Sequence, residues 1–167
     1  MESKVLVACV GNIFLGDDAF GVEVAVRLRQ ELLPDCVKVV DFGIRSYDLA
    51  YALMEPWDDV ILVDALPRGG IAGTIYVLEP ELPSDVANGQ SPSIDAHSMN
   101  PVAVLQMAHA LGGNIRRMLV VGCEPSSVEA DGTGNFELSP PVQAAVGEAV
   151  ETIKKLIERA RSRKVAA

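Results

Sequence analysis

The stretch Lys4–Val10, with the sequence KVLVACV, is followed directly by Gly11 and gives the first indication of the fold. A near-continuous apolar run of this length, ended by a glycine, is typical of a central parallel strand that is buried on both faces. Such a strand needs a strand on each side and helices above and below it. The rest of the chain should therefore alternate strands with helices.

The remaining sequence has this alternation. Further strands are predicted at residues 37–42, 59–65, 73–78 and 118–123. Helices are predicted from about Asp17 to just before Pro34, and over residues 47–55, 101–111 and from Pro140 onward. We expect an α/β fold, a three-layer αβα sandwich with a twisted, mostly parallel five-stranded sheet, formed by residues 1–167 as a single domain.

The ends and faces of the predicted helices carry recognisable signals. Ser46, Asn100 and Ser139 are the expected N-caps. The first helix is expected to bury a stripe that includes Leu28 and Leu32. The last helix should bury the apolar stripe formed by Val142, Val146, Val150, Ile153, Ile157 and Ala160.

Composition restricts the classes of partner. The chain has 167 residues and a net charge of −9 at pH 7, which argues against nucleic acid or an anionic membrane as a partner but not against a cation. No apolar run approaches the ~20 residues that span a bilayer. Three cysteines, at 9, 36 and 123, form no Cys-x-x-Cys pair, so we expect a reducing, cytoplasmic location.

In doubly wound sheets, ligands bind outside the carboxyl ends of the strands. The loop after the first strand reads GNIFLGDDAFG over residues 11–21. A glycine-rich turn before a helix suggests phosphate binding, but the loop matches neither the dinucleotide fingerprint nor a P-loop. Asp17 and Asp18 also stand where a phosphate would need positive charge. Two readings stay open, a site that uses these acids and simple capping of the following helix.

Two more residues near strand ends could join this loop. Asp64 follows four apolar residues, and a carboxylate is costly to bury there unless it is paired or bound to a cation. His97 precedes the helix predicted at 101–111, whereas His109 lies within that helix and should be on its surface or partly buried. Asp18, Asp64 and His97 together could hold a divalent first-row metal and leave positions open for a substrate. Turn capping by Asp64 and a structural His97 remain the alternatives.

Four motifs, in this order along the chain, resemble the [NiFe]-hydrogenase maturation protease family. They are VGNIFLGDDAFG at 10–21, ILVDA at 61–65, HSMNPVAVL at 97–105, and VGCEP with LSPPV between 121 and 142. The resemblance covers essentially the whole chain. It implies a hydrolase, an endopeptidase that removes the C-terminal extension of a [NiFe]-hydrogenase large-subunit precursor after nickel insertion. The precursor is then the expected partner, with no nucleic acid and no membrane.

The same resemblance implies that Asp18, Asp64 and His97 are both the metal-contacting and the catalytic residues. The metal would be Ni carried by the precursor, and Cd or Zn could substitute for it. Many relatives have Glu where this chain has Asp18. Two chemical steps remain open, metal-assisted hydrolysis and general-base catalysis by a carboxylate, with Asp18 preferred and Asp17 second.

Secondary substrate-binding candidates are Asp17, Asp41 and Gly43. Residues 41–45 read DFGIR, where many relatives have Asp-Gly-Gly-Thr. We expect this segment to face the cleft and the added Phe42 and Arg45 to affect which large subunit is accepted. The alternative function is a metal- or nucleotide-binding module without peptidase activity, such as a metallochaperone.

Overall fold

Five strands form one sheet in the order β2-β1-β3-β5-β4. The computed structural model describes residues 3–80, 101–113, 115–126 and 136–165. The strands are β1 (Val5–Val10), β2 (Val37–Gly43), β3 (Asp59–Ala65), β4 (Ile75–Leu78) and β5 (Met118–Cys123). All neighbours pair in parallel except β4, which is antiparallel to β5. The predicted fold class, a mostly parallel five-stranded α/β sheet, is confirmed.

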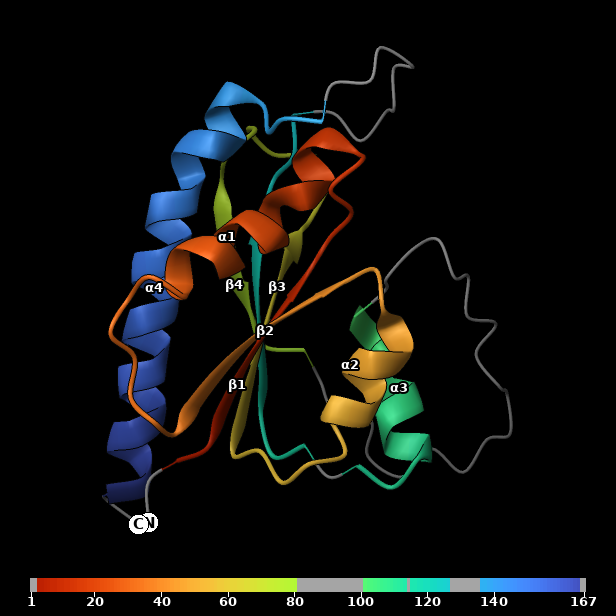
Figure 1. The fold of residues 1–167 in the computed structure, drawn as a ribbon, viewed down its shortest axis with the longest axis vertical. Coiled ribbons are helices and arrows are strands. Elements are labelled where there is room, and N and C mark those ends of the chain that lie inside the picture. The colour runs from red at the N-terminus through yellow and green to blue at the C-terminus, as the bar shows by residue number, and fades with distance from the viewer. Residues whose placement is uncertain (1–2, 81–100, 114, 127–135, 166–167) are drawn as a thin grey trace.

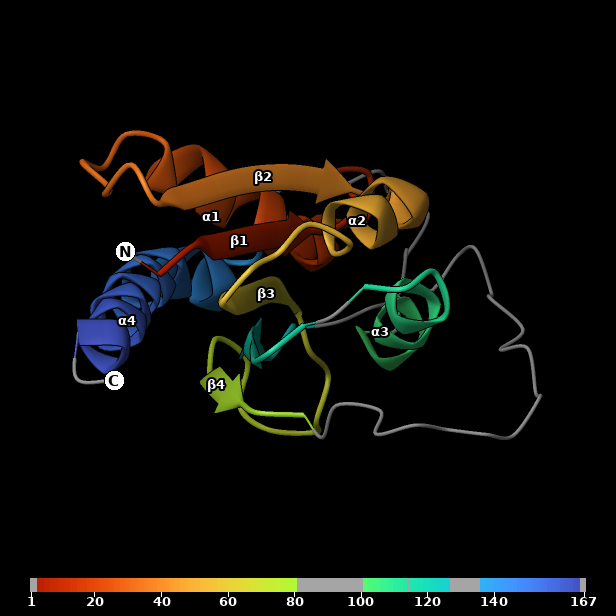
Figure 2. The ribbon, with the colours of Figure 1, turned by 90° about the horizontal axis from the view of Figure 1, so that it is seen from below.

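Helices cover both faces of this sheet, as Figures 1 and 2 show. The helices α1 (Phe20–Leu28) and α4 (Pro140–Val165) pack on one face, and α2 (Ser46–Ala52) and α3 (Pro101–Ala110) pack on the other. Within the part of the chain that the structure describes, none of these helices combines the length and the apolar character needed to cross a bilayer.

The strand β1 lies between the two helical layers. Val5, Val7 and Cys9 belong to the core under α1 and α4, whereas the alternate residues Leu6, Ala8 and Val10 belong to the core under α2 and α3. All six side chains are fully buried. This alternation across the sheet is the period-two pattern of a strand, and it confirms the double burial predicted from KVLVACV.

The first predicted helix is shorter than expected. A 3₁₀ turn, η1 (Gly16–Ala19), precedes α1, and α1 ends at Leu28. Leu32, which was expected on its buried stripe, is fully exposed. The expectation of a helix reaching to Pro34 was therefore wrong. After Leu28 the chain turns, with the N–H of Glu31 donating to the carbonyl of Leu28, and Leu33 packs against the core in place of Leu32.

Two other ends also differ from the prediction. Ser46 is the first residue of α2, and its expected role as N-cap is wrong because Arg45 occupies that position without a side-chain cap. The strand predicted at 73–78 begins at Ile75, since Thr74 closes a turn in which its hydroxyl donates to the carbonyl of Ile71 at 2.6 Å. The predicted cap Asn100 lies outside the described residues.

The last helix agrees with the prediction. All six residues of its apolar stripe are buried against the sheet and α1, namely Val142, Val146, Val150, Ile153, Ile157 and Ala160. Near its C-terminus, Arg163 donates to Asp59, the first residue of β3, at 2.5 Å. This pair joins the end of α4 to the edge of the sheet where β3 begins. The loops that follow the strands lie at the opposite edge, where the parallel strands end.

Candidate functional site

Two glycines allow the turn η1 to lie directly against the carboxyl ends of the central strands. Gly21 has no room for a Cβ, which would overlap the backbone carbonyl oxygens of Val10 and Val63. Gly11 has a φ of +151°, and a Cβ there would overlap the carbonyl oxygen of Asp18. The glycines of the first motif therefore serve close backbone packing, which brings η1 to the ends of β1 and β3.

This packing places Asp18 of η1 near Asp64 of β3. Both carboxyl groups are partly buried. Burial raises the pKa of the Asp64 carboxyl well above its ordinary value, and the charge of Asp18 raises it further, against a lowering hydrogen bond from the N–H of Ala65. Asp18 and Asp64 therefore lie at the same edge of the sheet, where the charge of Asp18 acts on Asp64.

A short hydrogen-bond chain fixes the position of Asp18. Its Oδ2 accepts the N–H of Asn12 at 3.1 Å, and its backbone carbonyl accepts the same N–H at 3.2 Å. The side chain of Asn12 in turn accepts the N–H of Phe14 at 3.0 Å. Burial raises the pKa of the Asp18 carboxyl from its ordinary value, although the hydrogen bond from Asn12 lowers it. A carboxyl with a raised pKa is better matched to proton transfer near neutral pH.

The neighbouring acid, Asp17, has a different environment. It is buried, and its Oδ1 accepts the N–H of Ser139 at 2.6 Å. Its Oδ2 accepts the N–H of Ser126 at 2.7 Å and the hydroxyl of Ser139 at 2.8 Å. Asp17 therefore joins η1 to the segment after β5 and to the start of α4. With three donors on its two oxygens, Asp17 is suited to positioning the loops, and Asp18 is the acid available for chemistry.

The loop after β2 lies beside the first motif. The N–H of Gly11 donates to the carbonyl of Gly43 at 3.0 Å, and the Oδ1 of Asp41 accepts the N–H of Gly43 at 2.9 Å. Gly43 has a φ of +54°, a conformation that favours glycine. The two secondary candidates Asp41 and Gly43 thus shape this loop and hold it next to Gly11.

The expectation for Phe42 was wrong. Its side chain is buried in the core under α2 and α3 and does not face a cleft. Arg45 is exposed, but its guanidinium donates back to the carbonyls of Phe42 at 3.0 Å and of Asp41 at 2.6 Å. The structure therefore leaves Arg45, and not Phe42, as the residue of this pair that a partner could contact.

Glu124 is a residue whose role the sequence did not indicate. It is buried directly after β5, and its carboxylate accepts the N–H groups of Arg68 and Gly69 and the hydroxyl of Tyr76, at 2.9–3.0 Å. Burial would raise the pKa of Glu124, but these hydrogen bonds outweigh it, so that the pKa is lowered. Glu124 fixes the β3–β4 loop at the same edge as Asp64. An acid directly after an apolar strand was the available signal, and the same signal had singled out Asp64.

The third predicted metal contact, His97, lies outside the described residues. Among the residues that the structure does describe, no three His, Cys, Asp or Glu side chains gather closely enough to hold a metal ion. The other two predicted ligands, Asp18 and Asp64, lie at the carboxyl edge of the sheet. Their chemistry fits a divalent cation, because such an ion offsets both their mutual repulsion and the cost of their burial.

The thiol of Cys123, at the end of β5, is not suited to metal binding. Cys123 is buried, and burial together with the charges of Asp17 and Glu124 raises its pKa to about 12. A thiol with such a pKa stays protonated at neutral pH, whereas a metal binds the thiolate.

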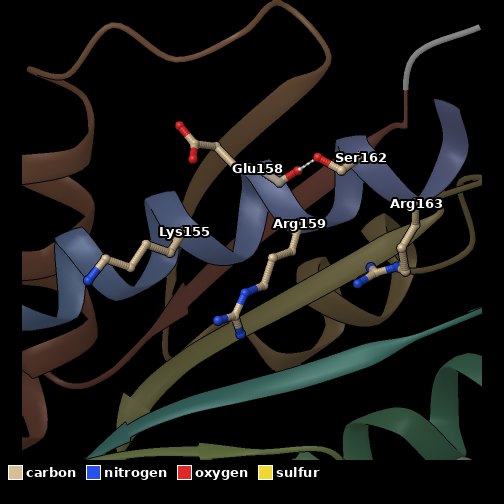
Figure 3. A pocket seen from close by; sticks show the side chains of 5 residues that line it. All are labelled: Lys155, Glu158, Arg159, Ser162 and Arg163. Atoms are coloured by element: carbon tan, nitrogen blue, oxygen red, sulfur yellow. Dashed lines mark hydrogen bonds between the residues drawn. The ribbon is translucent and has the colours of Figure 1, made fainter. Parts of the chain in front are cut away.

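A separate pocket lies at the opposite edge of the molecule. Figure 3 shows this pocket, of about 490 Å³, which is lined by Lys155, Glu158, Arg159, Ser162 and Arg163. Its wall includes the arginine that pairs with Asp59 at the start of β3. Because Asp18 and Asp64 lie at the carboxyl ends of the strands, this basic pocket is distinct from the candidate site.

The chain is similar to proteins of one family over most of its length. A family model described as hydrogenase maturation protease matches residues 22–156. The hydrogenase 2 maturation protease of Escherichia coli K12 is 31% identical over 153 residues, which cover 90% of this chain and 88% of that protein.

Solved structures agree with this similarity. The hydrogenase maturating endopeptidase HybD from E. coli superimposes with a TM-score of 0.73 at 27% identity, over 94% of this chain and 93% of that one. The [NiFe] hydrogenase maturation protease HycI from Thermococcus kodakarensis gives a TM-score of 0.67 at 26% identity, over 94% of each chain.

Proposed function

Since this chain belongs to the hydrogenase maturation protease family and is a peptide hydrolase of that kind, we propose that it cleaves the C-terminal extension from a [NiFe]-hydrogenase large-subunit precursor. The observation that carries this proposal is the packing of the first motif against the ends of β1 and β3, which brings Asp18 to the edge of the sheet where Asp64 lies. The charge of Asp18 raises the pKa of Asp64, and a cation brought by a substrate would offset this repulsion.

In the proposed reaction, the precursor presents its nickel to Asp18, Asp64 and His97. The nickel is part of the substrate, so the two carboxylates can remain without an ion of their own between turnovers. Cleavage then depends on nickel insertion, because only a loaded precursor supplies the charge that the two acids bind. Cd²⁺ and Zn²⁺ are expected to occupy the same ligands, since imidazole and carboxylate bind both classes of ion.

The residues of this chain have separate tasks in the reaction. Asp18 is the preferred general base, because its pKa is raised and the described residues provide it with one hydrogen-bond donor, the N–H of Asn12. Asp64 holds the metal from the end of β3. Asp17 and Glu124 keep the surrounding loops in place through buried hydrogen bonds. The proposed location is the cytoplasm, where the buried thiols of Cys9 and Cys123 stay reduced.

The test compares two forms of one precursor. A large-subunit precursor is prepared with nickel and without it, each is incubated with the protein, and the products are identified by intact mass. We expect loss of the C-terminal extension from the nickel-loaded form alone. Cleavage of both forms would contradict nickel-dependent recognition, and cleavage of neither would contradict the protease function and favour a non-catalytic metal-binding module.

Single substitutions test the proposed roles of the three residues in cleavage. Asp18→Asn and Asp64→Asn remove one negative charge each with little change in volume and should abolish cleavage, as should His97→Ala. Asp35→Asn is the matched control, because Asp35 is exposed in the segment between α1 and β2. Normal processing by His97→Ala would remove that residue from the site and leave the carboxylate pair in place.

A further inference from the structure

An exposed apolar surface borders the candidate site. It consists of Ile13, Phe14 and Leu15 from the loop between β1 and η1, together with Phe136 from the segment before α4, and we name it the apolar rim. The side chains of Phe14 and Phe136 are 67% and 59% exposed, and those of Ile13 and Leu15 are 51% and 41% exposed. None of the four belongs to either core cluster of the described residues. Their apolar character is therefore not explained by the packing of the fold.

The two aromatic side chains of the rim contact each other across two loops. Their ring centroids are 6.1 Å apart and their planes meet at 85°, an edge-to-face arrangement. Aromatic pairs adopt this geometry because the positive edge of one ring meets the negative face of the other. The contact joins segments that are more than 120 residues apart in the sequence, and it leaves most of both rings open to a partner.

Hydrogen bonds tie the two segments that carry the rim to Asp17 and Asp18. Phe14 donates its N–H to the side chain of Asn12, whose own N–H bonds to the carboxylate of Asp18. Phe136 lies three residues before Ser139, which bonds to Asp17 through its N–H and its hydroxyl. The backbone of Phe14 and the segment that carries Phe136 are thus tied to the Asp17–Asp18 turn. A partner bound on the rim would lie next to the turn that carries Asp18.

We propose that the apolar rim is the surface on which the large-subunit precursor docks, with Phe14 and Phe136 as its anchors. This inference rests on the proposed function and adds to it the residues that provide affinity. A folded precursor that brings its nickel to Asp18 and Asp64 must pass over the loops that surround them, so the rim is continuous with the reacting site. Aromatic side chains are enriched at protein interfaces, and a few anchors of this kind dominate binding.

The test separates docking from chemistry. Phe14→Ser, Phe136→Ser and the double variant are compared with Leu32→Ser, which removes a fully exposed apolar side chain from the segment between α1 and β2. The measurements are KM and kcat for cleavage of the nickel-loaded precursor, and its affinity for each variant. Titration with Zn²⁺ and thermal unfolding report whether the site and the fold are intact.

We expect the double variant to raise KM and the dissociation constant about tenfold or more while kcat, Zn²⁺ binding and the melting temperature stay close to those of the parent. Leu32→Ser should change none of these. If the parent cleaves the precursor and the double variant has the same KM and affinity, the docking role is refuted and the protease function stands. If the parent cleaves no precursor, the protease function fails, and unchanged affinity in the double variant would refute docking as well. Loss of a parent dimer in sedimentation, with precursor affinity unchanged, would identify the rim as a self-association surface and overturn the proposal.

Discussion

Substitution of Asp17 should lower the free energy of unfolding by an amount that can be worked out from its hydrogen bonds. Its carboxylate accepts three hydrogen bonds, from the N–H of Ser126, the N–H of Ser139 and the hydroxyl of Ser139, at 2.6–2.8 Å. In Asp17→Asn, one oxygen still accepts the N–H of Ser139. The new NH₂ group faces the N–H of Ser126, so two donors meet and this hydrogen bond is lost. The hydroxyl of Ser139 can rotate and accept from the NH₂ group.

The expected cost follows from these changes. One charge-assisted hydrogen bond to a partly buried donor is lost, and the others become neutral, which together amounts to about 2 kcal/mol of unfolding free energy. For a domain of this size, that change lowers the melting temperature by roughly 4–8 °C. Asp17→Ala loses all three bonds and should cost about 4 kcal/mol.

Chemical denaturation and thermal unfolding of the purified variants measure these values. Asp35→Asn provides the matched control, because Asp35 is exposed and its replacement should change stability by no more than about 0.5 kcal/mol. The decisive comparison is between Asp17→Asn and this control. Equal stability of the two would refute the role of Asp17 in joining η1 to the start of α4.

Three further predictions concern the same edge of the sheet. Gly21→Ala should lower the melting temperature sharply, because its Cβ would overlap the carbonyls of Val10 and Val63; a parent-like melting curve would contradict this close packing. Glu124→Gln should lower the melting temperature at pH 7. Folding lowers the pKa of Glu124, so the difference in melting temperature should shrink as the pH falls below 4.5, the ordinary pKa of a glutamate. A pH-independent difference would argue against the carboxylate as the cause. Asp64→Asn should raise the melting temperature at pH 7 in the absence of metal. Folding raises the pKa of Asp64, so the parent loses stability as the pH rises through that pKa, whereas Asn does not ionise; a lower melting temperature for the variant at pH 7 would refute this.

The fold was largely predictable from local patterns. The run KVLVACV needs burial on both faces, and that requirement led to the parallel sheet. The apolar stripe of α4 was confirmed residue by residue, because a helix that packs on a sheet repeats its buried positions at a constant spacing. The end of α1 was not predictable in this way, since Leu32 continues the helical spacing in the sequence although the chain has already left the helix at Leu28.

The site was predictable in part. Asp18 and Asp64 follow apolar strands or glycine-rich turns, and strand ends in a parallel sheet meet at one edge. The tasks of Asp17 and Glu124 depend on partners 48 to 122 residues away, which no local pattern contains. Phe42 was expected to face the cleft because many relatives have another residue there. Its side chain instead points to the same face of β2 as Val40, toward the core under α2 and α3.

The central claim is that Asp18, Asp64 and His97 bind one metal ion together. A crystal structure of the protein with Zn²⁺, with anomalous scattering recorded at the zinc edge, tests it most directly. We expect a single strong peak with carboxylate oxygens of Asp18 and Asp64 at about 2.0–2.2 Å and a ring nitrogen of His97 at about 2.0–2.1 Å. A peak that contacts neither carboxylate, or no peak at saturating Zn²⁺, would contradict the claim.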